Sequence, residues 1–220
     1  MPTLDRDGEV FVLDLGGGEN RFHPDWITAV HAALDEVEAT DGPRALVTSA
    51  TGKFFSNGLD LDWLGAHPDE LYQYLANIQE LLARYLTFPA PTVAAVQGHN
   101  FGAGAMLALA NDFRVMRADR GFFCLPEVDL GMPFTVGMSA LVQARLEKQT
   151  AHEAMTTGRR YGGTDAVAAR IVDAVADEGK VLSKALELAR PLTNKPAKAL
   201  GTIKSQMYRE VTTALRQATV

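Results

Sequence analysis

The sequence has a single cysteine, Cys124, among 220 residues. A chain with one cysteine cannot form an internal disulfide, which fits a protein that folds in a reducing compartment. The thiol is either reactive or a small core side chain, and the usual burial of free cysteines favours the core.

Long apolar runs are also missing. No stretch reaches the roughly 18 apolar residues of a membrane-spanning helix, and the N-terminal residues lack the apolar core of a secretory signal. We therefore expect no membrane partner and a cytoplasmic location.

Positive charge is in the minority. Lys and Arg together number 21 against 27 Asp and Glu, which gives a formal net charge of −6 at pH 7. Nucleic-acid binding requires a clustered basic surface, so we expect no nucleic-acid partner. A small anionic ligand fits this balance only where positive side chains gather locally.

The common cofactor and metal motifs are incomplete. The five histidines show no paired ligand spacing, so we expect no metal site. Gly16-Gly17-Gly18 follows a predicted strand but lacks the spaced glycines of a dinucleotide loop, which favours a simple turn. The run TGK at 51–53 lacks the upstream glycine and the following Ser or Thr of a phosphate-binding loop.

The chain does contain a regular alternation of strand and helix patterns. Branched apolar runs predict strands, and apolar residues at helical spacing predict helices. The predicted strands lie at 9–15, 44–50, 92–97, 113–118 and 121–125, and the predicted helices at 23–40, 69–88 and 103–110. Buried strands that alternate with helices indicate an α/β fold with mainly parallel pairing.

The pattern changes near residue 135. From Val136 onward the sequence is almost wholly helical, apart from one strand-like run at 169–175. No low-complexity linker divides the chain. We expect one continuous domain, with a β-α core over 1–135 and a mainly helical region over 136–220.

Two glycine-containing loops are candidates for a ligand site. SNGLD (56–60) and FGAGA (101–105) each follow a predicted buried strand. If these strands are neighbours, the loops meet at the carboxyl edge of the sheet, where α/β proteins bind ligands. One backbone N–H from each loop would then point at one oxygen, and the second N–H would lie at a helix N-terminus. Two unrelated glycine turns are the alternative.

Three motifs together resemble the crotonase (enoyl-CoA hydratase/isomerase) superfamily. They are FFSNGLDLDWL, PTVAAVQGHNFGAGAMLALANDFRVM and FCLPEVDLGM, and the resemblance covers roughly residues 9–175. It implies a crotonase-like spiral of β-β-α units that carries an acyl-CoA site. It also implies a C-terminal region that forms a homotrimer or a dimer of trimers. Because CoA is part of the substrate, the resemblance implies no separate cofactor.

The resemblance also implies an oxyanion hole for the thioester carbonyl. Its donors would be the backbone N–H groups of Leu59, which follows Gly58, and of Ala103, which follows Gly102.

Contacts with CoA are implied in the same way. The carbonyls near Ser56 and Asn57 would face the adenine of CoA. Lys53 would contact a CoA phosphate, and a solvated surface lysine is the alternative.

Glu127, in the segment GFFCLPEVDLG, has apolar neighbours on both sides. Burial would raise the pKa of its carboxyl group. A base whose pKa lies nearer the working pH is better able to take up a proton and to return it. A glutamate at a helix start or in a salt bridge is the alternative interpretation. Asp129, two residues on, is a weaker candidate acid.

The sequence departs from two-acid members of the superfamily. Hydratases carry a second glutamate where this chain has Met106, and dienoyl-CoA isomerases carry a later aspartate where it has Thr135. With Glu127 left alone, the match is to single-glutamate Δ3,Δ2-enoyl-CoA isomerases, with Met106 keeping the opposite wall dry. A hydratase or another crotonase reaction is one alternative. A catalytically silent acyl-CoA-binding paralogue is the other, suggested by departures such as Arg170 at a position that is usually glycine.

Overall fold

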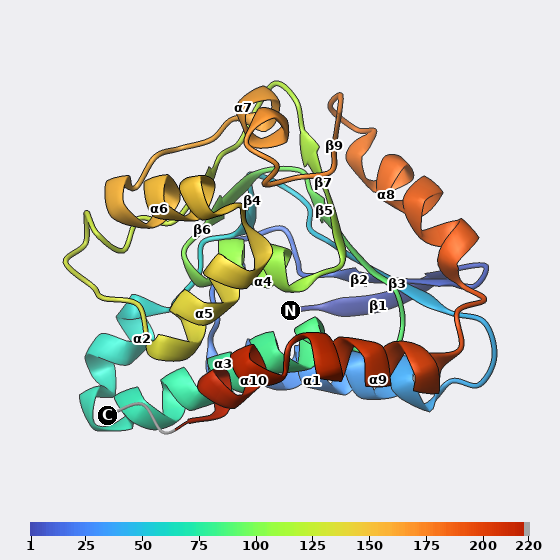
Figure 1. Ribbon diagram of the computed structural model, residues 1–220, viewed down its shortest axis with the longest axis horizontal. Coiled ribbons are helices and arrows are strands. Elements are labelled where there is room, and N and C mark those ends of the chain that lie inside the picture. The colour runs from blue at the N-terminus through green and yellow to red at the C-terminus, as the bar shows by residue number, and fades with distance from the viewer. Residues whose placement is uncertain (218–220) are drawn as a thin grey trace.

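The computed structural model describes residues 1–217, and a large sheet forms its centre (Figure 1). Within these residues its strands are ordered β1-β2-β3-β5-β7-β9. β1 and β2 pair antiparallel and the other neighbours pair parallel, which confirms the predicted α/β class. In that order the strands span Thr3–Asp7, Val10–Asp14, Ala45–Ser49, Thr92–Val96, Phe113–Arg117 and Ala174–Ala176.

A smaller sheet lies beside the large one. Its strands are β4 (Phe54–Ser56), β6 (His99–Phe101) and β8 (Phe123–Cys124), and they pair in parallel. β4 follows β3, β6 follows β5 and β8 follows β7, and helices come after each pair. The chain therefore repeats the β-β-α unit of the expected spiral.

β4 and β6 lie in segments predicted to be loops, and this prediction is wrong. Strands of three residues are too short to show the alternation on which strand prediction depends. The sequence also gives no sign of β1, because TLDRD contains one apolar residue. The Asp7-Gly8 pair, where β1 enters the two-residue turn Gly8-Glu9, is a hairpin signal that would have located β1.

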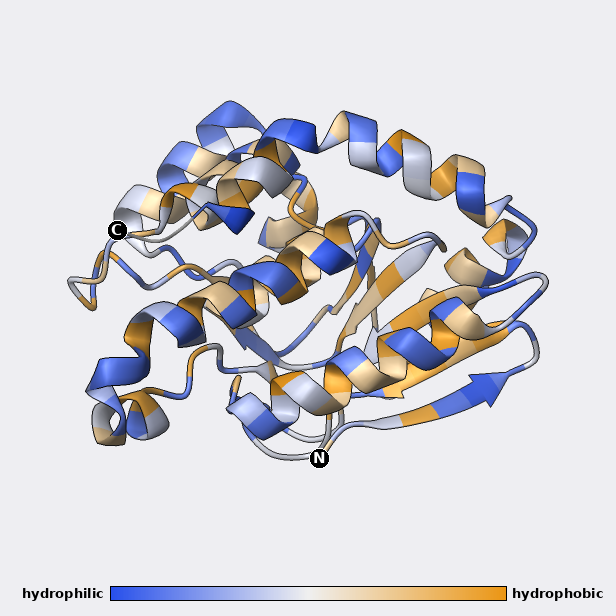
Figure 2. Ribbon diagram, turned by 90° about the horizontal axis from the view of Figure 1, so that it is seen from below, coloured by the Kyte–Doolittle hydropathy of each residue, from blue (hydrophilic) through white to orange (hydrophobic). Residues whose placement is uncertain are grey.

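The two faces of the large sheet build separate cores. Side chains alternate along each strand, so Leu46 points to one face and Val47 to the other. The first face packs against α1 (Pro24–Ala39), α3 (Leu71–Leu86) and α4 (Ala103–Ala110). The second is covered by α8 (Val181–Ala189). Figure 2 shows the contrast between the mainly hydrophobic sheet and the mixed colouring of the long helices.

Two of these helices confirm the sequence prediction closely. The helices predicted at 23–40 and 69–88 are α1 and α3. The predicted apolar stripe of α1 is buried at Trp26, Val30, Leu34 and Val37. A short helix between them, α2 (Leu61–Ala66), begins at Asp60, whose side chain caps it, and has no counterpart in the prediction.

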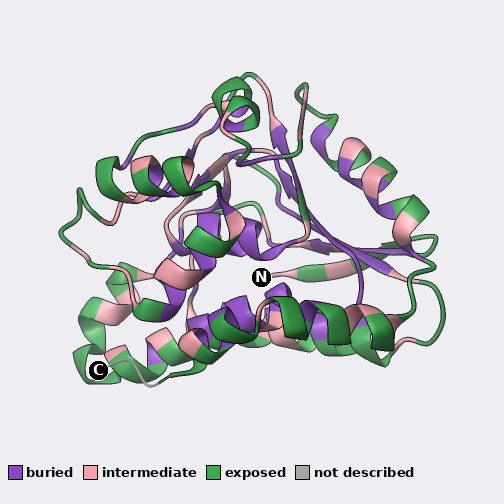
Figure 3. Ribbon diagram, viewed as in Figure 1, coloured by how far each residue is buried: buried purple, intermediate pink, exposed green. Residues whose placement is uncertain are grey.

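The third predicted helix, α4, occupies the middle of the molecule. All eight of its residues are buried, and Figure 3 shows them as a purple segment surrounded by other elements. It packs against β4 and β6 on one side and against α3 and α5 (Val136–Arg145) on others. Its composition, AGAMLALA, is apolar all round, as expected of a helix with no exposed face.

The region after residue 135 is mainly helical, as predicted. It contains α5, α6 (Lys148–Thr157), α7 (Gly163–Ala168), α8, α9 (Ala197–Met207) and α10 (Arg209–Arg216). β9 is the one strand that this region adds to the large sheet within the described chain, and it overlaps only the end of the strand-like run at 169–175. α10 packs against α3 and α5. The predicted range 136–220 extends three residues past the described part.

None of the helices in the described part is both long enough and apolar enough to span a bilayer.

Candidate active site

The two predicted glycine loops meet in space. Gly58 follows β4 and Gly102 follows β6, and these strands are hydrogen-bonded neighbours. A Cβ atom placed on Gly58 would lie 2.8 Å from the carbonyl oxygen of Phe101 and 3.1 Å from the nitrogen of Ala103. The loops therefore touch at Gly58, and the spacing leaves no room for a side chain there.

Glycine is required at both turns by backbone conformation as well as by space. Gly58 has φ of +78° and Gly102 has φ of +54°, a region that L side chains rarely adopt. Ser56 holds the first turn in shape, because its Oγ donates to the carbonyl of Asn20 and accepts from the N–H of Gly58. Gly104 lets the second turn approach Ser56, since an added Cβ would lie 2.6 Å from the Cβ of Ser56.

The amide groups that follow these glycines are free to bind a ligand. Across residues 1–217, neither the N–H of Leu59 nor that of Ala103 donates a hydrogen bond to a protein acceptor. Ala103 is the first residue of α4, where N–H groups have no partner inside the helix. The helix dipole favours a negative charge at this end. The structure thus brings together the two amides predicted to form an oxyanion hole.

Glu127 lies beside them, in the turn that follows β8. Its Oε1 is 3.3 Å from the position of a Cβ on Gly102, one residue before Ala103. Its Oε2 is buried and has no hydrogen-bond partner within the described chain. Burial raises the pKa of this carboxyl group to about 7. Glu127 is neither helical nor in an ion pair here, so the alternative structural interpretation of this residue is not what the structure shows.

Two cavities meet at these three residues. The larger, about 340 Å³, opens beside Cys124, Arg160 and Asn57. The smaller, about 80 Å³, is almost entirely apolar. Leu59, Ala103, Glu127 and Met132 line both cavities, so the carboxyl group and the free amides lie at the point where the two spaces join.

The smaller cavity lies between α4, α3 and the start of α5. Met106, which is 1 % exposed, forms its inner wall, so this side of the site is apolar. Leu71 and Leu75 of the predicted α3 stripe line the cavity and are half-buried. Thr135 also lines the cavity, and it begins α5 by accepting a hydrogen bond from the N–H of Met138.

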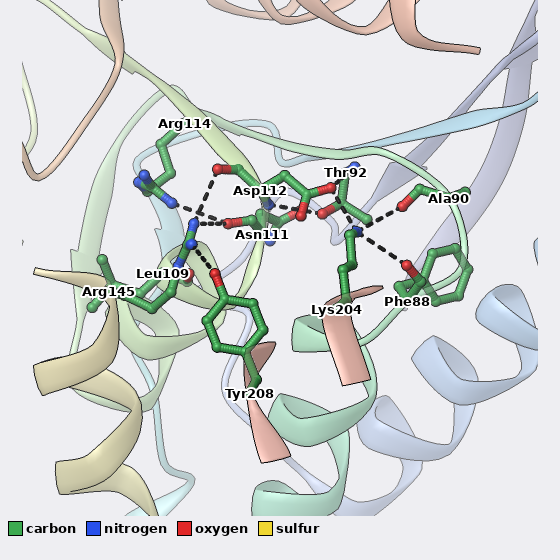
Figure 4. A network of polar contacts seen from close by, with 10 residues as sticks. All are labelled: Phe88, Ala90, Thr92, Leu109, Asn111, Asp112, Arg114, Arg145, Lys204 and Tyr208. Carbon is green, nitrogen blue, oxygen red and sulfur yellow. Dashed lines mark hydrogen bonds and ion pairs between the residues drawn. The ribbon is translucent and has the colours of Figure 1, made fainter. Parts of the chain in front are cut away.

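The far end of α4 is held by a network of buried polar side chains (Figure 4). Arg145 donates to the carbonyls of Leu109 and Asn111, and Arg114 also donates to Asn111. Lys204 of α9 forms an ion pair of 2.6 Å with Asp112. The C-terminal carbonyls of α4 thus have cationic partners, which suits the negative end of the helix dipole.

The remaining predicted residues are placed differently. Asn57 lines the larger cavity, and its side chain donates to Glu19. Ser56 is fully buried behind the loop, where it acts on the turn. The side chain of Lys53 does not reach either cavity at Glu127, because it lines a separate cavity near Arg117 and Arg120.

Asp129 and Cys124, the two other candidate groups, are not placed or ionised as catalytic groups would be. The carboxylate of Asp129 lies against Gly158, outside the residues that line the two cavities. Burial raises the pKa of Cys124 to about 11, and its Sγ donates to the carbonyl of Gly158. A thiol held in this state is a poor nucleophile at neutral pH, as expected of a core cysteine.

Some residues of the site come from distant segments and were not predicted from the sequence. Arg21 and Arg160 line the larger cavity, together with Phe101 of the predicted FGAGA loop. Arg160 lies between α6 and α7 in the helical region, where nothing in the local pattern marks a ligand contact. Within the described residues, no three His, Cys, Asp or Glu side chains gather in a way that would hold a metal ion.

Comparison with known proteins identifies one family. The family described as enoyl-CoA hydratase/isomerase matches residues 10–220. Two curated relatives from Arabidopsis thaliana are enoyl-CoA delta isomerase 2, peroxisomal, and enoyl-CoA delta isomerase 3. They are 37% and 36% identical to this chain, and each alignment covers 96% of this chain and 93% of the relative.

Solved structures agree in fold. A probable enoyl-CoA hydratase from Mycobacterium tuberculosis superposes with a TM-score of 0.91 at 28% identity, covering 99% of this chain and 92% of that one. Human mitochondrial delta3-delta2-enoyl-CoA isomerase superposes with a TM-score of 0.89 at 24% identity, covering 97% and 85%. The second match supports the fold alone.

Proposed function

The chain belongs to the enoyl-CoA hydratase/isomerase family, and on this premise we propose that it isomerises enoyl-CoA thioesters with Glu127 as its single base. The double bond moves from C3=C4 to C2=C3. The observation that carries the proposal is the position of one largely buried carboxyl group, whose Oε2 has no hydrogen-bond partner in the described chain, at the junction of two cavities and beside two free amides. Similarity to the two Arabidopsis delta isomerases supports the same reaction.

The reaction needs one proton carrier. Glu127 takes a proton from C2, and the electron pair of the C2–H bond moves into a C1=C2 bond while the thioester oxygen becomes negative. In the resulting dienolate the C3=C4 bond is still present. Protonated Glu127 then gives the proton to C4, the double bond settles at C2=C3 and the carbonyl re-forms. No atom or electron is supplied from outside the substrate, so we propose that no separate cofactor takes part.

The free amides of Leu59 and Ala103 stabilise the intermediate in this scheme. Both N–H groups would donate to the thioester oxygen as its negative charge develops. Ala103 adds the field of the α4 N-terminus. Loss of one such donor costs about 3 kcal/mol in enzymes where it has been measured. The amides therefore supply much of the rate enhancement, and Glu127 supplies the proton transfer.

The pKa of Glu127 suits a group that both takes and gives a proton. At a pKa of about 7 the carboxyl group is populated in both forms at neutral pH. An ordinary glutamate, with a pKa near 4.5, would be a much weaker base toward carbon. The raised pKa is caused by burial in an apolar wall, which is the physical role of the apolar residues that precede Glu127 in the sequence.

The smaller cavity would hold the acyl chain beyond the reacting carbons. Its lining by Met106, Leu71 and Leu75 offers apolar contacts, and the hydroxyl group of Thr135 in the same wall already donates to Gln79. Hydration requires a water molecule beside C3, and this wall disfavours one. The same wall therefore supports isomerisation over hydration.

A product assay tests the proposal directly. We expect the purified protein to convert a 3-enoyl-CoA to the 2-trans-enoyl-CoA, seen by ultraviolet absorbance of the conjugated thioester and by chromatography. Incubation of 2-enoyl-CoA in parallel should yield little 3-hydroxyacyl-CoA. A 3-hydroxyacyl product formed faster than the isomer would instead establish a hydratase, the activity after which the mycobacterial relative is named. Binding of acyl-CoA without any turnover would establish a silent paralogue.

The homotrimer, or dimer of trimers, expected from the family resemblance is part of the proposal. Light scattering during size-exclusion chromatography would test it, with three or six times the chain mass as the expected result. The cytoplasmic location stays a prediction from the sequence.

A further inference from the structure

The cations that line the larger cavity differ in whether their charge is available. An acyl-CoA substrate carries several phosphate charges, and this chain has a net charge of −6, so binding needs a local positive group. Arg21 and Arg160 are the cationic residues among those that line this cavity. The inference that follows rests on the proposed acyl-CoA function.

The charge of Arg21 is already compensated. Its guanidinium pairs with Glu19, Asp60 and Asp62. Hydrogen bonds with Asp62 and Glu19 raise the pKa of Arg21, as expected for a group held by carboxylates. An arginine with this many acidic partners contributes shape and hydrogen bonds to the cavity wall more than net positive charge.

Arg160 is in the opposite situation. In the described part of the chain no carboxylate pairs with it, although the neighbouring Arg159 pairs with Glu153 and Asp165. Its guanidinium lies 5.8 Å from the ring centroid of Phe101, which lines the same cavity. The ring keeps the charge at the cavity wall without neutralising it.

The charge of Arg160 acts on Cys124, which lines the same cavity. Burial raises the pKa of Cys124, and the positive charge of Arg160 opposes that rise. The pKa of Glu127 is raised by burial, with no cation among the causes. The cavity thus has a permanent cation at Arg160, whereas at Glu127 burial is what raises the pKa of the titrating group.

We propose that Arg160 binds a phosphate group of the CoA moiety of the substrate. A guanidinium pairs with phosphate through two parallel hydrogen bonds, which makes arginine well suited to this contact. The assignment differs from the sequence prediction, in which Lys53 contacts the phosphate. Lys53 lines a separate cavity and lies over the ring of Phe54.

The test compares substrates with and without phosphate. Arg160→Gln should raise KM for a 3-enoyl-CoA about 10-fold and leave kcat within about 2-fold, because the lost contact is equally present in ground and transition states. KM for the matching 3-enoyl-pantetheine thioester, which lacks the phosphates, should not change. Arg160→Lys should restore part of the affinity, since it keeps the charge but not the paired geometry.

Two variants serve as controls. Arg159→Gln removes the adjacent guanidinium, which is exposed and outside the cavity lining, and should leave KM for both substrates unchanged. Lys53→Gln tests the competing assignment. An unchanged KM in Arg160→Gln together with a raised KM in Lys53→Gln would overturn the proposal. So would an equal rise of KM for both substrates in Arg160→Gln, because the residue would then shape the cavity and not bind phosphate.

The phosphate contact can be judged even if the proposed reaction is wrong. If the wild-type protein turns over neither substrate, calorimetric titration with butanoyl-CoA replaces the kinetics. Weaker binding by about 10-fold in Arg160→Gln, with unchanged binding in Arg159→Gln, supports the contact on its own. Equal affinity in wild type and Arg160→Gln overturns it.

Discussion

The backbone groups at the two ends of helix α4 differ in whether they have hydrogen-bond partners. At its N-terminal end, the N–H of Ala103 has no acceptor within the described residues, and Oε2 of Glu127 has no donor. At its C-terminal end, Arg114 and Arg145 satisfy the carbonyls, and Lys204 secures the Asp112 that follows. The helix is only about 12 Å long, so both conditions exist within one short rigid segment.

The difference between the two ends separates groups that serve the reaction from groups that stabilise the fold. Unpaired polar groups in a buried place destabilise the fold, and they are kept where a substrate will pair with them. Saturated groups stabilise the fold and hold the helix in position, and they bind nothing else. We therefore expect substitutions at the two ends to have different consequences: loss of activity at the first and loss of stability at the second.

The largest expected effect on kcat is at the N-terminal end of α4, which we call the open end because the N–H of its first residue, Ala103, has no acceptor in the described chain. Glu127→Gln keeps the shape of the side chain and removes the base, so kcat for isomerisation should fall by about 10³- to 10⁴-fold. The free energy of unfolding should not fall, because Oε2 has no partner to lose and the amide oxygen of Gln can still accept the backbone hydrogen bond that the carboxyl group has. Stopped-flow or steady-state absorbance would give kcat, and urea unfolding would give the stability.

Asp129→Asn is the matched control for this substitution. Asp129 is two residues away and its carboxylate lies against Gly158 instead of in the cavities. We expect kcat within a few-fold of wild type. Activity retained by Glu127→Gln, or a comparable loss in Asp129→Asn, would contradict the assignment of the base.

The next largest effect, on stability, is expected at the C-terminal end of α4, which we call the closed end because its carbonyls have partners. Lys204→Met leaves the half-buried Asp112 with one partner fewer, and since removing one member of a fully buried ion pair costs about 3–5 kcal/mol, we expect a cost of about 2 kcal/mol for this partly exposed pair. The free energy of unfolding should fall by that amount, whereas kcat per folded molecule should change little. Lys198→Met, at an exposed position of the same helix, should leave both unchanged. A large loss of kcat in folded Lys204→Met would show that the two ends are not separable.

Gly58→Ala tests how closely the loops must approach at the open end. An added Cβ would lie 2.8 Å from the carbonyl of Phe101, and φ at this position is +78°. The loop must shift, which moves the N–H of Leu59 away from that of Ala103, so kcat should fall about 100-fold. Gly65→Ala in α2 has open space and no such φ, and it should be silent. Normal kcat in Gly58→Ala would remove Leu59 from the proposed oxyanion hole.

The stability and kcat/KM of the wild type should both depend on pH through the Glu127 carboxyl group at the open end of α4. The carboxyl group of Glu127 has a pKa of about 7 in the folded protein and about 4.5 when unfolded. Between these values the folded state holds the proton more tightly, so stability decreases as pH rises from about 5 to 7, by roughly 2–3 kcal/mol. kcat/KM should increase over the upper part of that range, since the base must be ionised.

Glu127→Gln should lack this contribution to the pH dependence of stability. Urea unfolding of both proteins at pH 5, 6, 7 and 8 would isolate it as the difference between the two curves. Parallel curves would mean that Glu127 is solvated in the folded protein, and the base would then lack its raised pKa.

The sequence was informative about one kind of feature and silent about another. The loops around Gly58 and Gly102 and the acid Glu127 could be predicted, because each lies in a motif made of consecutive residues. Arg160 could not, because it reaches the cavity only after the chain has wound back from α6. The three-residue strands β4 and β6 that bring the loops together were likewise too short to show a pattern.

The closed end shows the same limit. Lys204 is 4 % exposed in a helix that the sequence identifies only as amphipathic, and its partner Asp112 lies far from it in the chain. Buried ion pairs depend on tertiary geometry, so a sequence pattern cannot separate such a lysine from the exposed Lys198. Arg170 is a third case. The sequence showed arginine at a position that is usually glycine, and the structure shows that this residue has a positive φ.

The smallest expected effect follows from that departure. Arg170 comes directly after the C-cap of α7 and has φ of +55°, a position where glycine is usual. Arg170→Gly relieves the left-handed strain of about 1 kcal/mol, and part of that gain is offset by the greater freedom of glycine when unfolded. The exposed pair with Glu147 contributes little. We expect a net gain near 0.5 kcal/mol and a rise in Tm of about 1–2 °C by calorimetry, with kcat unchanged. Arg170→Ala removes the same side chain but keeps the strain, so it should not stabilise. An equal gain in both variants would place the effect in the side chain, and a change of kcat in either would connect this turn to the open end of α4.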